Sequence, residues 1–332
     1  MPYAPGLLAR KQIVSYTNTL PGYLDGLDLS CLGDAVTAVR VSTFTALDRQ
    51  TLRLYRWGSP AAEKLILLPP YGITFLLLSP LARCLSQRFE VLSWESAGCP
   101  SADDSLCGEP TRLDRQSAQL GEIVRVQGLE EFHFVGWCQA AQLCVYSLAA
   151  AHVRPRTLTW IAPAGLGHGL VKSEFDRCAL PIYLEIERQG VAQAEKLGRI
   201  LDKYRDQSLT AANVAEKLTM LHLSDPQMTY RFARYMRAYV DNQAVVRSLL
   251  DDVLETPRTQ VIHCKDDTYS HFSESVELAK MYPGMRLELL PRGGHLHLFR
   301  SPQLVAELIF KHIDRECRPA SESPARLAQI LE

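Results

Sequence analysis

The order of strand-like and helix-like segments limits the fold of this chain more than any other feature of its sequence. Short apolar runs at 65–68, 89–94, 132–135 and 157–161 predict strands. Helical spacing of apolar residues fills the intervals between them. Strands that alternate with helices through short loops predict an α/β fold, in which a mostly parallel sheet is covered by helices on both faces.

A long block without strand signals interrupts this alternation after Gly169, and the next strand is predicted at 259–264. Within the block the apolar spacing is helical, most clearly at 185–204, 211–223 and 227–250. Helices inserted between two strands of an α/β sheet are the expected form of a lid. The 332 residues, 47% of them hydrophobic, suffice for one large core with such an insertion. We therefore predict an α/β core at 1–165 and 255–316, a helical lid at 166–254 and a flexible tail at 317–332.

Charge, apolar runs and cysteine content exclude several other classes. The 36 basic and 37 acidic residues nearly cancel, which argues against a nucleic-acid partner. No signal peptide is expected, and prolines and glycine interrupt the longest apolar stretch, Leu65–Ala82, so no membrane span is predicted. Nine cysteines without C-x-x-C or metal-ligand spacing indicate reduced thiols, a cytoplasmic location, no metal site and no bound cofactor.

A cysteine stands at a position that favours nucleophilic chemistry. The sequence Gly136-Trp137-Cys138-Gln139-Ala140 lies where a predicted strand turns into a helix, and Gly-x-nucleophile-x-small is the nucleophile-elbow pattern. Only the thiolate is a good nucleophile, and the positive end of the following helix favours that anion. The alternative is that Cys138 is a small buried residue in an ordinary strand–turn–helix.

Two further loops supply an acid and a histidine in the chain order that such a nucleophile requires. An apolar strand runs into Asp266-Asp267, and a later strand, predicted at 286–290, is followed by the loop Gly293-Gly294-His295. His295 would accept the proton of the nucleophile and return it to the leaving group. The acid would hold the imidazole in the useful tautomer. By analogy with similar loops Asp267 is preferred, and Asp266 remains the alternative.

The remaining histidines are weaker candidates. His297 has no glycine hinge directly before it, so it competes poorly with His295. His133 and His263 lie within predicted strands and are expected to be structural.

An oxyanion hole needs two backbone N–H donors. The residue after the nucleophile, Gln139, is one candidate, and the loop that follows strand 65–68 should give the other. Because Pro69 and Pro70 open that loop, Tyr71 is the predicted second donor. Trp137 would either line an acyl pocket or pack beside the elbow.

Residues from about 50 to 316 resemble the α/β-hydrolase fold family, on the elbow, the Asp266-Asp267 loop and the Gly293-Gly294-His295 loop. Dienelactone hydrolases and polyhydroxyalkanoate synthases also have cysteine elbows, usually with glycine two residues after the cysteine, where this chain has Ala140. The chain looks more similar to the aminoacyl-shuttling transferases of non-ribosomal peptide pathways, of the syringomycin and coronamic acid type. That resemblance implies transfer of an aminoacyl group between the phosphopantetheine thiols of two carrier proteins.

The chemistry of a thiol favours the same function. A thioester donor, a thioester on Cys138 and a thiol acceptor are nearly matched in energy, whereas a serine would form a deeper oxyester trap. The predicted function is therefore acyl transfer with carrier proteins as partners. The alternatives are a cysteine-type thioesterase, esterase or lactone hydrolase, and a non-catalytic scaffold of the same fold. The sequence leaves the acyl group and the oligomeric state open.

A charged stripe in the lid is a candidate docking surface. Three arginines spaced i, i+3, i+6 on one predicted helix, with tyrosines beside them, would suit an acidic carrier surface or a phosphopantetheine phosphate. The alternative is an ordinary solvated helix face. The residues are Arg231, Arg234 and Arg237, beside Tyr230, Tyr235 and Tyr239.

Overall fold

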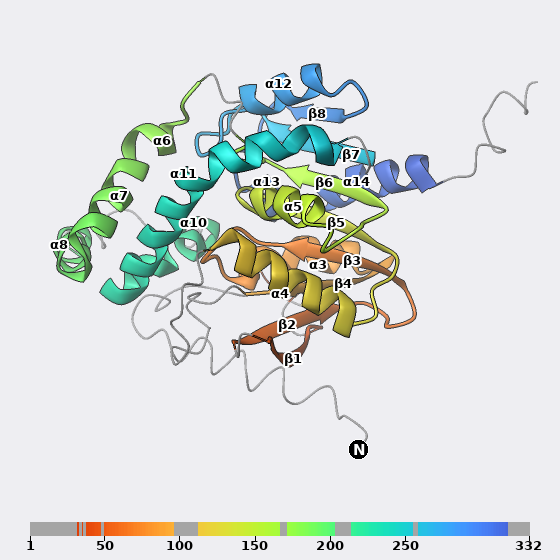
Figure 1. The fold of residues 1–332 in the computed structure, drawn as a ribbon, viewed down its shortest axis with the longest axis horizontal. Coiled ribbons are helices and arrows are strands. Elements are labelled where there is room, and N and C mark those ends of the chain that lie inside the picture. Colours follow the sequence, from red (N-terminus) through yellow and green to blue (C-terminus); the bar gives the residue numbers. More distant parts are fainter. Residues whose placement is uncertain are drawn as a thin grey trace, which may run out of the picture.

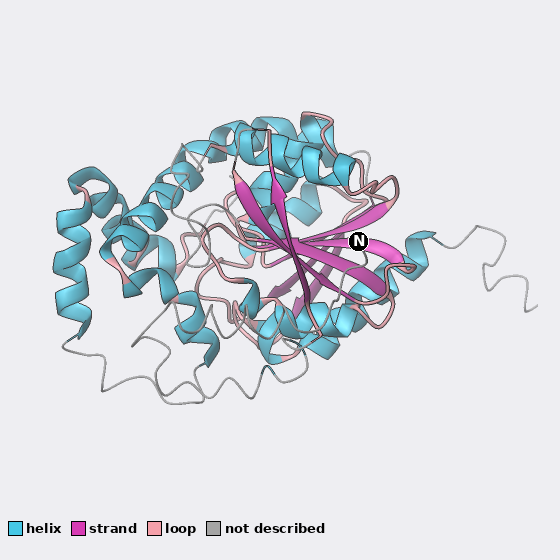
Figure 2. Ribbon diagram, turned by 90° about the horizontal axis from the view of Figure 1, so that it is seen from below, coloured by secondary structure: helices cyan, strands magenta, loops and turns pink. Residues whose placement is uncertain are grey.

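A central sheet of eight strands lies between layers of helices in the computed structural model of the protein (Figures 1 and 2). The strand order is β1-β2-β4-β3-β5-β6-β7-β8. The structure describes residues 32, 35, 38–47, 50–95, 112–166, 171–202, 214–254 and 258–317. Most of the predicted tail, from residue 318 onward, lies outside these residues.

The sheet is parallel from β4 to β8 and antiparallel only where β1 and β2 join its edge. Strands β5 and β6 are buried along their whole length, as expected for central strands covered on both faces. The α/β fold predicted from the sequence is therefore confirmed. The strands are β1 Arg40–Thr45, β2 Thr51–Trp57, β3 Glu63–Leu68, β4 Phe89–Trp94, β5 Phe132–Trp137, β6 Thr157–Ile161, β7 Arg258–Cys264 and β8 Arg286–Leu290.

The helices of the core pack in two groups. Helix α4 packs against α5, and α3 packs against α13 and α14. Helix α3 begins at Ser79, because a separate turn of 3-10 helix precedes it and Pro80 occupies its first turn. These elements are η2 Phe75–Leu77, α3 Ser79–Leu85, α4 Leu113–Val126, α5 Ala140–Ala149, α12 Ser273–Met281, α13 His297–Arg300 and α14 Pro302–Cys317.

All described elements between β6 and β7 are helical; α6, α7, α8 and α10 lie at the left of Figure 1, and α11 runs from there over the core. The longest, α11, packs against α7 and α8 and also against core helix α5. The single helix expected at 185–204 is instead two helices, because Gly190 ends α7 with φ 82°. The elements are α6 Glu174–Cys178, α7 Leu180–Gln189, α8 Val191–Asp202, α10 Val214–Thr219, η5 Leu221–Ser224 and α11 Pro226–Leu254.

None of the described helices is both long and apolar enough to cross a membrane.

Gly58, directly after β2, packs closely against the backbone of the neighbouring strand β4. Its φ is 85°, and a Cβ there would lie 2.2 Å from the carbonyl oxygen of Phe89. We expect Gly58→Ala to lower the free energy of unfolding by about 3 kcal/mol or more, because a backbone oxygen cannot move away cheaply. Gly190→Ala is the matched control: its φ is 82° but nothing lies within 4 Å, so a loss of about 1–2 kcal/mol is expected. Equal shifts of the two urea midpoints would contradict this account.

Candidate active site

Cys138 lies in a strained turn between β5 and α5. Its φ is 55°, in a region that few residues other than glycine adopt, and its N–H donates to the carbonyl of Ile161 at 2.9 Å. Gly136 permits this close packing, since a Cβ there would lie 3.0 Å from the Sγ of Cys144. The turn places half-buried Cys138 at the carboxyl edge of the sheet, with a helix starting two residues later.

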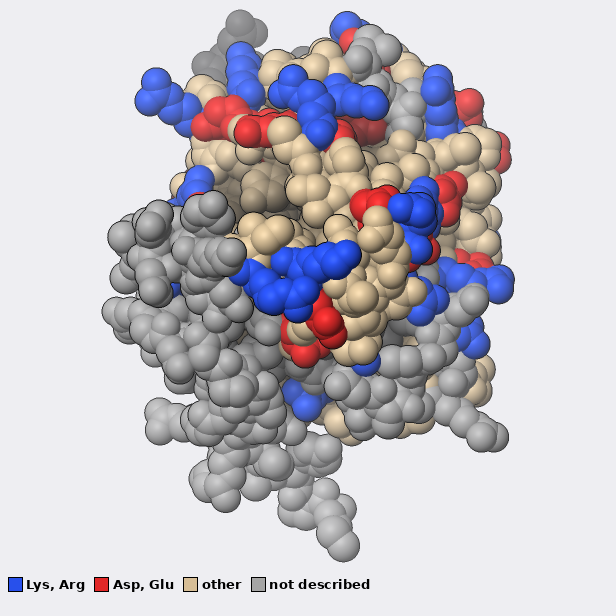
Figure 3. All heavy atoms as spheres, turned by 90° about the vertical axis from the view of Figure 1, so that its left-hand side faces the viewer, with Lys and Arg blue, Asp and Glu red and all other residues tan. Residues whose placement is uncertain are grey.

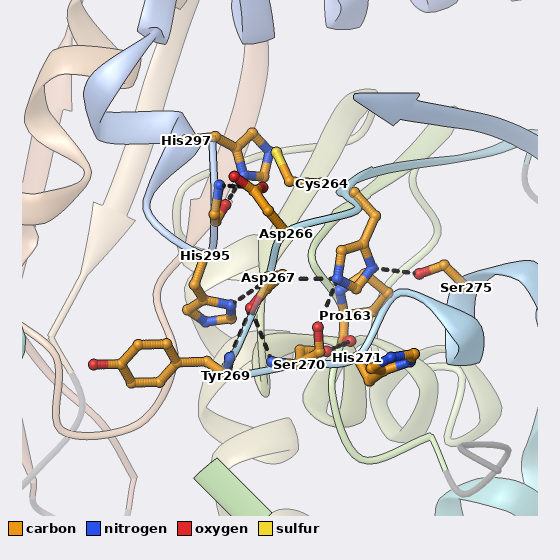
Figure 4. Close-up of polar contacts among 12 residues, drawn as sticks. Pro163, Cys264, Asp266, Asp267, Tyr269, Ser270, His271, Ser275, His295 and His297 are labelled. Atoms are coloured by element: carbon orange, nitrogen blue, oxygen red, sulfur yellow. Dashed lines mark hydrogen bonds and ion pairs between the residues drawn. The ribbon is translucent and has the colours of Figure 1, made fainter. Parts of the chain in front are cut away.

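His295 is held beside Cys138 by an aspartate. Its Nδ1 lies 2.8 Å from Oδ2 of Asp267, and its ring lines the same cavity as Cys138. Both His295 and Asp267 are buried. Figure 4 shows the two approaching from different loops, Asp267 after β7 and His295 after β8. The structure thus brings together the three predicted triad residues, while their catalytic roles stay predictions.

Asp266 has a different task. Its carboxylate accepts hydrogen bonds from the N–H groups of Gly293 and Gly294, at 3.1 and 2.8 Å. Gly293 and Gly294 have φ values of 138° and 63°, so glycine is needed at both positions. Asp266 therefore fixes the loop that carries His295, and the geometry favours Asp267 as the residue that orients the imidazole.

A second histidine, His263, completes the surroundings of the Asp267 carboxylate. Its Nε2 lies 3.3 Å from Asp267 Oδ2 and 2.9 Å from the carbonyl oxygen of Ser270. Since both neighbours are acceptors, Nε2 carries the proton. The other carboxylate oxygen accepts from the N–H groups of Tyr269 and Ser270 at 2.8 and 3.0 Å. That His263 is structural stays a prediction, and its contact with Asp267 was missed because no local pattern links a mid-strand histidine to a loop acid.

These contacts set the charges of the site. Burial alone would lower the pKa of His295, but Asp267 and Cys138 outweigh it and raise the pKa to about 10. Burial would likewise raise the pKa of Asp267, yet the charges and hydrogen bonds of His295 and His263 hold it well below its usual range. His297 differs, because burial lowers its pKa to about 4. His297 is therefore neutral, and it is less suited than His295 to carry a proton.

A pH dependence of stability follows from His295. Because its pKa in the folded protein lies above the ordinary value of 6.5, charged His295 stabilises the fold fully below about pH 6.5 and progressively less as pH rises to about 10. We expect the melting temperature to fall more between these two pH values in the wild type than in His295→Gln. Parallel melting curves for the two proteins would show that His295 is not the charged group.

The predicted oxyanion donors lie on the cavity wall next to Cys138. Within the described part of the chain, the backbone N–H groups of Tyr71 and Gln139 donate to no acceptor. The buried ring of Tyr71 stacks on Tyr235 of α11 with centroids 5.2 Å apart, and Gln139 Nε2 lies 3.6 Å from Sδ of Met236. The helix α11 thus fixes both residues, which leaves their N–H groups suited to stabilise an oxyanion.

A cavity of about 220 Å³ opens at Cys138 and extends under the helices between β6 and β7. Its wall is largely aromatic and aliphatic, which suits the apolar part of a small acyl group. Trp137 lines this cavity and also packs beside His295, with ring centroids 5.3 Å apart, while its part in binding an acyl group stays a prediction. The other lining residues are Pro70, Tyr71, Ile73, Cys138, Gln139, Ala164, Phe175, Ala179, Tyr183, Thr219, Met220, His222, Leu223, Phe232, Tyr239, Tyr269 and His295.

The arginine and tyrosine stripe of α11 does not form one surface. Arg231, Arg234 and Arg237 are partly exposed, whereas Tyr235 and Tyr239 are buried. Arg237 reaches Glu187 of α7 at 3.4 Å. Tyr235 and Tyr239 therefore serve the interior, whereas half-buried Tyr230 and the three arginines stay partly accessible. Figure 3 shows the face that carries these helices, with a hollow between clusters of basic side chains.

Among the described residues, no group of three or more His, Cys, Asp or Glu is placed to hold a metal ion.

Sequence and structure comparisons agree with this geometry. The model of the alpha/beta hydrolase family matches residues 65–308, and the chain belongs to that family. No curated protein matches the sequence.

Several solved structures share the fold. A membrane phospholipase A, described as a bacterial virulence factor, has a TM-score of 0.61 and 16% identity over 94% of this chain and 99% of its own. A hydrolase from Pseudomonas aeruginosa has a TM-score of 0.58 and 18% identity, over 82% of this chain and 98% of its own. A haloalkane dehalogenase from Bradyrhizobium elkani has a TM-score of 0.65 and 11% identity, over 82% of this chain and 98% of its own. At such low identity the likeness shows the fold alone.

Proposed function

We propose that the protein is an acyltransferase that moves an aminoacyl or related acyl group between the phosphopantetheine thiols of two carrier proteins. The observation that carries the proposal is the thiol of Cys138, at a nucleophile elbow, on the wall of the same apolar cavity as His295, which is paired with Asp267. The neighbours of known structure named above include hydrolases, so a cysteine-type hydrolase is the second candidate.

The first half of the reaction loads the enzyme. The Cys138 thiolate attacks the thioester carbonyl of the donor, and the oxyanion of the tetrahedral intermediate accepts hydrogen bonds from the N–H groups of Tyr71 and Gln139. The bond between the carbonyl carbon and the donor sulfur then breaks. His295 gives its proton to the departing arm thiolate, and Asp267 keeps the imidazole oriented.

The second half reverses these steps with a new thiol. His295 takes the proton of the acceptor arm, whose sulfur attacks the acyl group on Cys138, and the Cys138 thiolate leaves. Since the thioesters before, during and after transfer are similar in energy, the reaction runs in either direction. A serine at this position would leave an oxyester that a thiol removes less readily.

The exposed parts of the arginines on α11 support docking of an acidic carrier surface beside the cavity. We expect this reaction in the cytoplasm on the ground of the reduced cysteines alone.

Partition of the acyl group between a thiol and water tests the proposal. A donor carrier loaded with a labelled aminoacyl group is mixed with the enzyme, with and without an acceptor carrier, and both acyl-acceptor and free acid are measured. We expect acyl-acceptor to dominate and free acid to form slowly. Release of acid at the same rate with or without acceptor would favour the hydrolase. No reaction across a panel of thioesters and esters would leave a non-catalytic scaffold.

A further inference from the structure

A second cavity, of about 280 Å³, adjoins the cavity of about 220 Å³ at Cys138, which is called the acyl cavity from here on. Three residues line both cavities: Ala164, Tyr239 and Tyr269. The remaining lining residues of the second cavity are Gly165, Val171, Lys172, Asp176, Leu180, Val240, Gln243, Ser270, His271 and Glu274.

The wall shared by the cavities lies next to the reacting groups. The N–H of Ala164 donates to the carbonyl oxygen of Cys138 at 3.3 Å, and the ring of Tyr269 stacks on His295 with centroids 5.1 Å apart. Buried Gln142 fixes the rest of the wall, because its Nε2 donates to the carbonyls of both Gly165 and Tyr239. A molecule in the second cavity therefore borders, at these shared residues, the cavity that contains Cys138 and His295.

The second cavity is polar, whereas the acyl cavity is apolar. Several of its polar residues already have partners: Asp176 accepts from Ser173, Glu274 accepts from the N–H of Leu166, and Ser270 donates to a carbonyl. The side chains of Gln243 and of exposed Lys172 make no hydrogen bond or ion pair with another described residue. The cavity thus offers a ligand one amide that can both donate and accept, and one ammonium at its exposed side.

We propose that the second cavity binds the phosphopantetheine arm of the donor, while the apolar cavity holds the acyl group; this inference rests on the proposed function. A thioester at Cys138 has two unlike halves, and the two adjoining cavities match them. Gln243 pairs with the amide of the arm farther from the sulfur, which N-acetylcysteamine lacks, and Lys172 pairs with the phosphate. The arm thus lies against Tyr239 and Tyr269, with its sulfur beside the shared wall.

Donors that carry progressively more of the arm test this assignment. The same acyl group is presented on N-acetylcysteamine, on pantetheine and on phosphopantetheine, and KM and kcat are measured for each. Gln243→Leu is expected to raise KM for the two longer donors about 5- to 10-fold, as for the loss of one neutral hydrogen bond, and to leave the N-acetylcysteamine donor unchanged. Lys172→Met is expected to raise KM about 10-fold for the phosphopantetheine donor alone.

Matched controls are Gln303→Leu and Lys311→Met on exposed positions of α14, which should leave all three donors unchanged. If Gln243→Leu and Lys172→Met change all donors equally, or change none, the second cavity does not bind the arm. That outcome is separate from failure of the proposed function, because acylation of Cys138 by the N-acetylcysteamine donor needs neither residue. Coenzyme A carries the same arm, so comparing acyl-coenzyme A with an acyl-carrier by kcat/KM identifies which of the two supplies it.

Discussion

Replacing Cys138 with alanine is expected to reduce acyl transfer by at least about 1000-fold, because the covalent intermediate can no longer form. The measurement is kcat/KM for transfer from a loaded donor carrier to an acceptor. Alanine suits the small space of the elbow, so the fold should persist, and an unchanged melting temperature would verify this.

Two companion variants sharpen the result. Cys178→Ala removes an exposed cysteine on α6 and should leave the rate unchanged, which excludes a general effect of thiol loss. Cys138→Ser should become acylated but pass the group to a thiol slowly, because the oxyester is the deeper trap. Undiminished transfer by Cys138→Ala would show that Cys138 is not the nucleophile. Fast transfer by Cys138→Ser would show that transfer does not require a thiol.

Substitutions of the two neighbouring aspartates, Asp267 and Asp266, are expected to differ widely in their effect on kcat. Asp267→Asn is expected to lower kcat about 100- to 10,000-fold, because an amide in place of the carboxylate no longer fixes the imidazole tautomer or stabilises its charge. The Asp267 carboxylate lies 2.8 Å from His295 Nδ1. A fall in the pKa of His295, followed by NMR of its ring protons, would show that the loss acts through this residue.

Asp266→Asn is the matched control at the adjacent position. Its remaining carbonyl oxygen can still accept from Gly293 or Gly294, so kcat should change less than about 10-fold. If the two substitutions exchanged these effects, Asp266 would be the acid that serves His295. Equal effects would mean that both only hold the loop in place.

Much of the fold could be predicted because its signals are local. The segments 89–94, 157–161 and 286–290 are apolar or alternate between turn residues, and each is a strand within those bounds. The helices between β6 and β7 had a longer signal and their type was predicted, but the break at Gly190 was not. A single glycine within a helical pattern does not tell whether the chain bends there.

The active-site residues, too, could be predicted only where their signal was local. The elbow and the glycine hinge are short motifs, so Cys138 and His295 could be identified from neighbouring residues. The choice between Asp266 and Asp267 required the loops after β7 and β8 to be placed side by side. The contact of His263 with Asp267, and the cavity beside Tyr269, likewise depend on packing between segments far apart in the chain.

The central claim, a thioester on Cys138, is tested most directly by intact-protein mass spectrometry after one turnover with a loaded donor and no acceptor. The account predicts a gain equal to the acyl mass, located on the peptide that contains Cys138 and lost when an acceptor thiol is added. Consumption of the donor without any mass gain, or an adduct on another residue such as Cys178, would contradict it.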